Sequence, residues 1–317
     1  MRGNREHNEG MSHVRYIEEP KLRRPVLILA FAGWNDASEV ATTSVKFLST
    51  RWKAKKFADI DPEEFYNFAR VRPHVHIEED FSRTITWPEN TFYYHVDPLL
   101  DRDFVLLLGI EPNLKWRTFC EEVLHVAHEA GVTSMLSLGG LIADVPHTRP
   151  PRLTAFSSDP DLTARFPELA LRRSRYEGPT GIVGVLSDVF TKSGIPVGSI
   201  WGNVPHYISA SPNPKVAHSI LSRLNTIYGL GLELSELERA GRRFERQVNE
   251  ALSNNPEVQQ YVSQLEAREE PTEEEAPPQR QAEGPVDLPR GEDIVRQLEE
   301  YLRQQATEKE EGNGDSS

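Results

Sequence analysis

Short apolar runs alternate with longer amphipathic stretches between residue 25 and about residue 228. The first run, PVLILAF, begins at Pro25, and three comparable runs follow at residues 103–112, 132–144 and 195–207. Continuous apolar segments that end near Gly, Pro or Asn are typical of buried strands. Because helical stretches separate these strands, the pattern predicts crossover units on a mostly parallel sheet, and the expected fold class is α/β.

Four helices are expected between and after these strands, at residues 35–49, 115–130, 181–192 and 214–228. The last begins with Pro214, and proline is favoured in the first helical turn because the N–H that it lacks would have no helical partner there. Right-handed crossover connections place such helices on both faces of the sheet.

Two stretches interrupt the alternation. Residues 54–96 contain shorter segments with one polar face, such as VHIEED, SRTITWP and TFYYHV, which predict an antiparallel edge or an inserted hairpin. Residues 147–167 are rich in proline, and we expect them to form a lid-like loop.

Apolar residues recur at helical spacing after residue 228 and predict two consecutive helices, broken at Asn255-Pro256. They are Leu234, Leu237, Phe244, Val248, Leu252, Val258, Tyr261, Val262 and Leu265. Residues 269–284 are Pro, Glu and Gln without periodicity, which predicts a disordered linker.

A narrow apolar stripe returns at residues 291–304 and predicts one short helix on this tether. Its members are Ile294, Leu298, Tyr301 and Leu302. Their spacing is that of a helix that binds in a groove, on the body, on a neighbouring subunit or on a separate partner. A solvated tail with residual helical tendency is an equal alternative.

The expected organisation is therefore a flexible N-terminus at residues 1–21, an α/β domain at 22–230, a helical segment at 231–268 and an acidic tail at 269–317. Net charge is −13. Residues 265–317 hold 16 acidic and 6 basic residues, so they carry −10 and leave −3 on the first 264. A nearly neutral body with an acidic tail does not favour nucleic acid or anionic lipid as a partner.

Cys120 is the single cysteine, which excludes an internal disulfide framework. It shares a helical stripe with apolar residues, so a core thiol is favoured over a nucleophile. The N-terminus has no apolar signal region, and no apolar run approaches the roughly 18 residues that a membrane span needs. We expect a soluble, cytoplasmic protein.

The turn Gly33-Trp34-Asn35-Asp36 follows the first strand, and two roles are open to it. Open α/β sheets place ligand sites at the carboxyl ends of their strands. Asn or Asp before a helix also caps it, because the side-chain oxygen accepts from free backbone N–H groups. The cap is favoured as at least part of the role, and a capping residue can still face a crevice.

Polar residues also end the third and fourth strands. His147 and Arg149 follow the third, and His206 and Tyr207 close the fourth. Parallel strands deliver their carboxyl ends to one edge, so these residues are predicted to converge with Asn35 and Asp36 on one crevice. Histidine and aspartate there have plausible acid and base roles.

The segment GPTGIVG places Gly178, Gly181 and Gly184 at the start of an apolar helix. Such an N-terminus can hold an anion, but the P-loop pattern is absent and no clear strand precedes it. Close helix packing is the favoured role of the glycines. Thr180 and Gly181 are retained as candidate crevice residues.

Further chemical motifs are weak. His74, His76, Glu78 and Asp80 alternate along an extended segment, but the same pattern describes a half-buried strand with its polar side in water, so no metal is expected. The patterns Gly-x-Ser-x-Gly and His-Glu-x-x-His do not occur. We therefore assign no catalytic residue and expect no cofactor.

The ordered motifs FAGWNDA, LGGLIADVPHTRP, GPTGIVGVLSD, IWGNVPHYISASPNPK and LERAGRRFERQVNEAL resemble the bacterial branch of the PAC2 family, the proteasome assembly chaperone 2 proteins. The resemblance spans residues 22–265. It implies a three-layer α/β/α domain similar to the nucleoside phosphorylase and hydrolase group, frequent homo-oligomerisation and no established catalytic set.

Archaeal and eukaryotic members of this family are associated with building the 20S proteasome, in some cases through a C-terminal hydrophobic-Tyr-x ending. This chain ends Gly-Asp-Ser-Ser and Tyr301 is internal, so that docking mode is not carried over. The leading hypothesis is a non-catalytic, homo-oligomeric assembly chaperone or scaffold with proteasome subunits or another protein as partner. The alternative is a small-molecule binder or a phosphorylase-like or hydrolase-like enzyme that uses the strand-end crevice.

Overall fold

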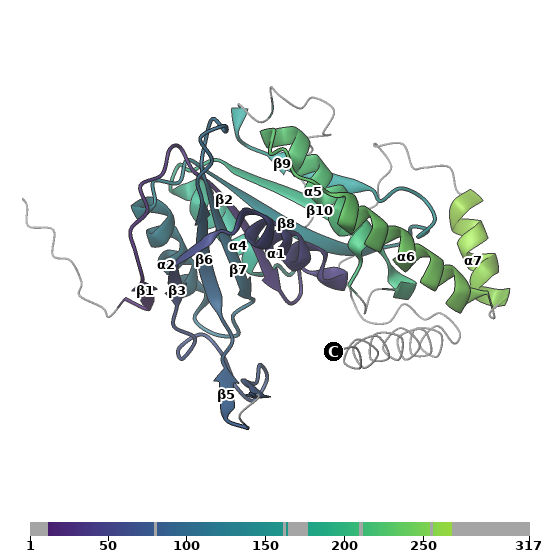
Figure 1. Ribbon diagram of the computed structural model, residues 1–317, viewed down its shortest axis with the longest axis horizontal. Coiled ribbons are helices and arrows are strands. Elements are labelled where there is room, and N and C mark those ends of the chain that lie inside the picture. The colour runs from purple at the N-terminus through teal and green to yellow at the C-terminus, as the bar shows by residue number, and fades with distance from the viewer. Residues whose placement is uncertain are drawn as a thin grey trace, which may run out of the picture.

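A mixed sheet forms the centre of the protein. The computed structural model describes residues 12–78, 81–160, 163, 177–208, 212–253 and 256–267. Within these residues the main sheet has eight strands in the order β1-β3-β6-β7-β2-β8-β10-β9 (Figure 1). The predicted α/β class is confirmed.

The middle of the sheet is parallel, as predicted. It contains β7 (Phe104–Ile110), β2 (Val26–Ala32), β8 (Ser134–Ala143) and β10 (Val197–Pro205). Strands β2 and β8 pair only as far as Leu29 and Ser137, whereas β8 and β10 stay paired to their ends. The pair β8–β10 therefore runs on beyond β2, and its polar ends lie farther along the same edge.

Antiparallel strands flank this centre. On one side are β6 (Asn90–His95), β3 (Lys55–Ile60) and β1 (Val14–Tyr16). The antiparallel edge predicted within residues 54–96 is confirmed. Strand β1 lies within residues 1–21, which were expected to form a flexible N-terminus. Its backbone pairs with β3, and this pairing holds it on the sheet.

The expectation of a loop throughout residues 147–167 is wrong at β9 (Leu153–Ser157), which pairs antiparallel with β10. Pro150 and Pro151 precede β9 and Pro160 follows it, so no proline interrupts the strand, and Ala155 faces the core. An edge strand of five residues was hidden by its proline-rich surroundings.

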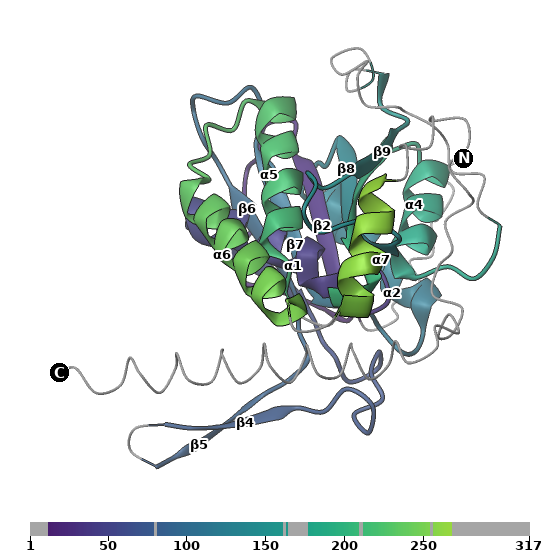
Figure 2. The ribbon, with the colours of Figure 1, turned by 90° about the vertical axis from the view of Figure 1, so that its right-hand side faces the viewer.

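The inserted hairpin is also confirmed. Strands β4 (His74–Ile77) and β5 (Arg83–Thr86) pair only with each other, and they project away from the body (Figure 2).

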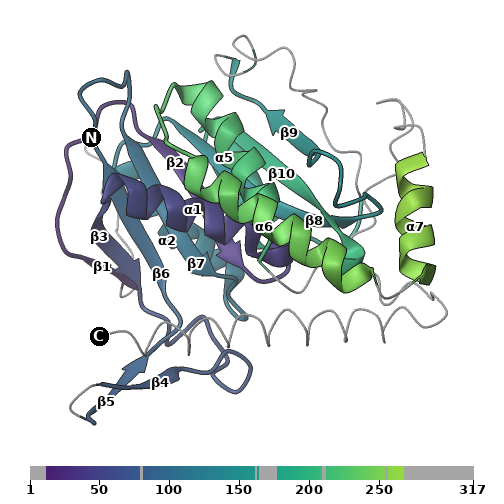
Figure 3. The ribbon, with the colours of Figure 1, turned by 45° about the vertical axis from the view of Figure 1, so that its right-hand side comes forward.

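Helices cover both faces of the sheet (Figures 2 and 3). Helices α1 (Val40–Trp52) and α5 (Pro214–Tyr228) lie on one face, and α2 (Trp116–Glu129) and α4 (Ile182–Lys192) lie on the other. Alternate residues of β2 supply the two cores, Leu27 and Leu29 to one and Ile28 to the other. A strand buried on both faces is continuously apolar for this reason.

Cys120 is fully buried in α2, which confirms its role as a core side chain. Burial raises the pKa of its thiol to about 12.

Two further helices, α6 (Ser235–Leu252) and α7 (Pro256–Ala267), confirm the predicted pair and its break. Helix α6 packs on α5. Helices α6 and α7 together bury a third apolar cluster against the end of β10. That cluster contains Tyr207, Ile208, Phe244, Val248, Leu252, Val258, Val262 and Leu265. None of the described helices combines the length and apolar character that crossing a bilayer requires. The predicted tail helix with Ile294, Leu298, Tyr301 and Leu302 lies outside the described residues.

Candidate functional site

The turn after β2 leads into α1 through an added turn of 3-10 helix, η1 (Ala37–Glu39). The predicted helix start at residue 35 is therefore wrong, because Ser38 and Glu39 adopt positive φ values and α1 begins at Val40. The backbone N–H of Gly140 in β8 donates to the carbonyl oxygen of Asn35 at 2.9 Å. This tertiary contact holds the turn against the sheet.

Asp36 caps α1 from a distance. Its Oδ1 accepts from the backbone N–H groups of Ala41 at 2.7 Å and Thr42 at 3.3 Å, and its Oδ2 accepts from the Thr42 hydroxyl at 2.5 Å. The carboxyl group is buried. Burial raises its pKa, and the hydrogen bonds from Thr42 and Ala41 oppose that shift. The capping role predicted for this turn thus belongs to Asp36.

Asn35 lies against the start of α4. An added Cβ on Gly181 would be 2.3 Å from Asn35 Nδ2, so the two residues touch closely. This contact agrees with the packing role proposed for Gly181. Asn35 is buried, and among the described residues its Nδ2 has no hydrogen-bond acceptor.

Glu111, which the sequence analysis did not single out, joins these two elements. Its Oε1 accepts from the backbone N–H of Ile182 at 2.8 Å, and its Oε2 lies 3.4 Å from the backbone nitrogen of Trp34. A carboxylate of the chain itself therefore occupies the N-terminus of α4, where the anion hypothesis would place a phosphate. The position of Glu111 directly after a buried strand was the available signal.

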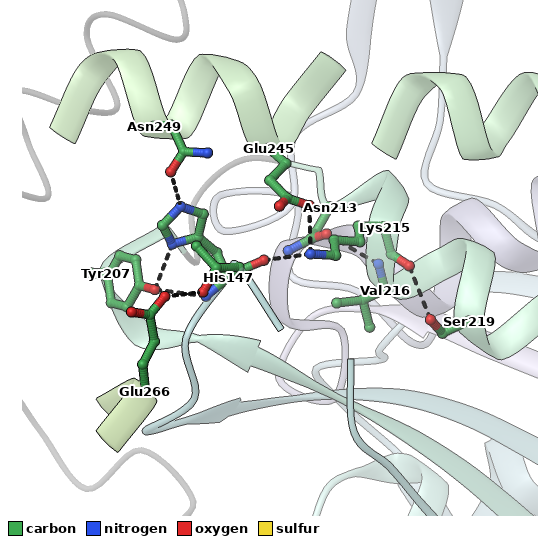
Figure 4. A network of polar contacts seen from close by, with 10 residues as sticks. His147, Tyr207, Asn213, Lys215, Val216, Ser219, Glu245, Asn249 and Glu266 are labelled. Carbon is green, nitrogen blue, oxygen red and sulfur yellow. Dashed lines mark hydrogen bonds and ion pairs between the residues drawn. The ribbon is translucent and has the colours of Figure 1, made fainter. Parts of the chain in front are cut away.

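His147 lies in a second polar group, between the sheet edge and the C-terminal helices. Figure 4 shows its ring between Tyr207 and Asn249 of α6. Nδ1 is 2.8 Å from the Tyr207 hydroxyl oxygen, and Nε2 is 2.9 Å from Asn249 Oδ1. The His147 backbone N–H also donates to the Tyr207 hydroxyl at 2.9 Å.

These contacts assign the proton on the ring. Asn249 Oδ1 only accepts, so Nε2 carries the hydrogen and Nδ1 accepts from the Tyr207 hydroxyl. Burial lowers the pKa of His147 and favours this neutral form. Both ring nitrogens are occupied, which leaves neither free to take a proton from a substrate in this arrangement.

Side chains from α5, α6 and α7 complete the group. Lys215 Nζ donates to the His147 carbonyl oxygen at 2.6 Å and pairs with Glu245 at 2.6 Å. Glu266 of α7 accepts from the Thr148 hydroxyl, and its carbonyl oxygen accepts from the Arg149 guanidinium.

His206 lies on the same side, where its ring meets those of Tyr207 and Tyr261 edge to face at 5.4 Å each. Its Nδ1 is 3.4 Å from Asp144 Oδ1, within ion-pair distance but without the geometry of a hydrogen bond. Burial lowers the pKa of His206 as well.

The predicted site residues thus form two groups at one edge of the sheet. Asn35, Asp36 and Gly181 belong to the first, and Thr180 lies beside it in the chain with its hydroxyl 3.4 Å from the Gly181 carbonyl oxygen. His147, Arg149, His206 and Tyr207 belong to the second. Ser38 connects the two, because its hydroxyl donates to Ile208 and its carbonyl oxygen accepts from Asn213. His74 and His76 lie apart from both groups, exposed on the hairpin, and Asp80 is outside the described residues.

Comparison with known proteins identifies the family. Residues 30–252 match the PAC2 family. The chain belongs to the PAC2 family. No curated protein matches it.

The solved structures similar to this PAC2 protein include bacterial and archaeal proteins. A PAC2 family protein from Streptomyces avermitilis is 43% identical, with a TM-score of 0.68 over 75% of this chain and 99% of that one. A proteasome-assembly chaperone homologue from Mycobacterium tuberculosis is 36% identical, with a TM-score of 0.67 over 75% and 99%. The archaeal proteasome activator PbaB from Pyrococcus furiosus, at 20% identity and a TM-score of 0.63 over 75% and 97%, shares the fold.

Acidification should destabilise this PAC2 protein through His147 and His206. Their folded pKa values lie below the value of about 6.5 in the unfolded chain, so the unfolded chain binds more protons as pH falls through that value. We expect the free energy of unfolding to fall between about pH 7 and pH 5, by up to about 1.4 kcal/mol per pH unit for each histidine. Urea unfolding across this range measures the slope.

The matched variants are His147→Gln and His128→Gln, the latter at an exposed position of α2. The first should reduce the dependence of the unfolding free energy on pH, whereas the second should leave it nearly unchanged. Glu245, Glu266 and Lys215 also face His147, and the two glutamates oppose the lowering of its pKa. Equal slopes in the wild type and His147→Gln would contradict the prediction.

Proposed function

We propose that this PAC2 protein is a non-catalytic assembly chaperone or scaffold that binds proteasome subunits and acts in the cytoplasm as a homo-oligomer. The observation that carries the proposal is the 36% identity with the proteasome-assembly chaperone homologue of M. tuberculosis, over 99% of that chain.

The use of the strand-end side chains supports binding over catalysis. An enzyme of this architecture would present polar groups to a substrate at this edge. Here His147 bonds to Asn249 and Tyr207, and Arg149 bonds to α7. These side chains hold the C-terminal helices on the sheet, and they leave the body as a platform for protein contacts.

The proposal is tested by binding of the full chain to purified proteasome subunits from its own source, measured by biolayer interferometry and by native gels of the assembling particle. We expect a complex with at least one subunit and faster assembly in its presence. Failure of every subunit to bind would overturn the proposal.

Removal of residues 268–317 should weaken this binding at least tenfold while the fold is retained. A chain that ends at Ala267 keeps Leu265, which is buried, and Glu266, which bonds to Thr148. Its thermal midpoint should therefore stay within a few degrees of the full chain. The matched point variants are Leu298→Glu, on the predicted stripe, and Gln297→Glu, beside it. Unchanged affinity after truncation would show that the body alone holds the partner.

A further inference from the structure

The hairpin β4–β5 is separate from the packed body. It projects from the rest of the ribbon (Figures 2 and 3). All eight residues of the two strands are exposed, and the hairpin's substantial contacts are between its own strands. A two-stranded hairpin alone is marginally stable in water, because it has no second layer on which to bury a face. An apolar face on the hairpin would therefore indicate that another molecule covers it.

One face of this hairpin is apolar. Val75 pairs with Ile85 and Ile77 pairs with Arg83, and residues paired directly across two strands share a face. Val75, Ile77 and Ile85 are 58%, 68% and 53% exposed. The other face carries the pairs His74 with Thr86 and His76 with Thr84. The apolar residues are thus gathered on one side, which we call the hairpin face.

The hairpin face is larger than the two strands. Trp87 follows Ile85 at the spacing that continues the row, and it is 45% exposed, with the Phe68 ring at 71° to its own at a centroid distance of 5.0 Å. Phe81 at the tip is 87% exposed. Contiguous exposed apolar residues of this kind mark an interaction site.

Charges along the hairpin favour a second copy of the same chain as the occupant. In the row Arg83-Ile85-Trp87 the cation lies toward the tip and the indole toward the base. If two hairpins pack face to face and antiparallel about an axis near Ile85, each Arg83 approaches the Trp87 ring of the other copy. Tryptophan is the ring that binds a guanidinium best.

The two ends of the hairpin also carry opposite charges that suit an antiparallel copy. Exposed Arg70 and Arg72 precede β4 at the base, while Glu78 follows β4 toward the tip. An antiparallel copy places Glu78 of each hairpin toward the end where the other copy carries Arg70 and Arg72. A partner of uniform charge would be repelled at one end, whereas a reversed copy is complementary at both.

We propose that the hairpin face is the self-association surface of this chain, joining two copies through a two-fold axis near Ile85, with Val75, Ile77 and Ile85 at its centre. A two-fold interface of this type repeats every contact, so one short segment contributes twice. The inference rests on the proposed function only in its homo-oligomeric part.

Sedimentation velocity of the full chain over a concentration series tests the surface. The wild type should associate, and Ile85→Glu should raise the dissociation constant at least tenfold because it buries two charges at the axis. The matched control is Thr86→Glu, which adds the same charge to the other face of the same strand. It should stay within about twofold of the wild type. Both variants should have the same thermal unfolding midpoint as the wild type, since the hairpin lies outside the packed cores.

A second pair of variants tests the orientation. Arg83→Gln and Trp87→Phe should each weaken association severalfold, and the double variant should cost less than the two together because both remove one contact. Wild-type protein that stays monomeric at every concentration, or equal association of Ile85→Glu and Thr86→Glu, would overturn the proposal. Binding to proteasome subunits is measured separately, so failure of either proposal is recognised by itself.

Discussion

Replacement of Asp36 by alanine is expected to lower the free energy of unfolding by about 3 kcal/mol. Loss of a cap costs about 1 kcal/mol, and each buried donor that is left without an acceptor adds about 1 to 3 kcal/mol. Asp36 accepts from the N–H groups of Ala41 and Thr42 and from the Thr42 hydroxyl, and all three residues are buried. Chemical denaturation at neutral pH measures the loss.

The matched variant is Asp36→Asn, which keeps an oxygen for both N–H groups and should lose less than half as much. Burial raises the pKa of Asp36 above its unfolded value, so its favourable contribution is complete below about pH 4 and declines as pH rises through the folded pKa. The asparagine variant should therefore compare better with the wild type at neutral pH than at acidic pH. Equal losses for alanine and asparagine would mean that the cap is not what Asp36 contributes.

Gly140→Ala should cost about 3 kcal/mol by displacing the turn that precedes α1. An added methyl group would lie 2.6 Å from the Ala37 carbonyl oxygen and 2.9 Å from the Ala37 nitrogen. These are backbone atoms, so the clash cannot be relieved by turning a side chain, and overpacking of a rigid site typically costs about 1 to 3 kcal/mol or more. The hydrogen bond from Gly140 to Asn35 would be strained as well.

Gly241→Ala in α6 is the control for this substitution. Its methyl group would lie 3.2 Å from Lys215 Cα, a tight contact that a small shift between α5 and α6 relieves, and alanine favours a helix over glycine by about 1 kcal/mol. We expect a change within about 1 kcal/mol. A Gly140→Ala protein as stable as the wild type would show that the turn can move away from β8 at little cost.

The sequence pattern was sufficient for the framework because β2 and β7 are apolar throughout, and β8 and β10 are apolar over most of their length. Strand β9 was missed because prolines surround it, and the start of α1 was misjudged because of a tertiary contact. The helical pattern runs unbroken through Ser38 and Glu39, but contact with Gly140 forces these two residues out of helical geometry. A tertiary contact of this kind leaves no mark in local propensity.

The candidate site divides in the same way. Asp36 could be recognised as a cap because its partners are within six residues. His147 also bonds to Asn249, and Arg149 bonds to Glu266, each more than 100 residues away in the chain. The parallel direction of the strands predicted which residues reach the edge, but not that α6 and α7 would cover them. Glu111 belonged to no motif, and only the position of α4 gives it a role.

Because Cys120 is buried, its thiol is unreactive in the folded protein. Cysteine reacts as the thiolate, and a pKa of about 12 leaves almost none at neutral pH. A second cysteine introduced on the surface would therefore take a spin label or fluorophore alone, with no need to remove the native residue. Modification of Cys120 itself would require the core beside α2 to open. Its labelling rate under native conditions therefore reports how often that core opens locally.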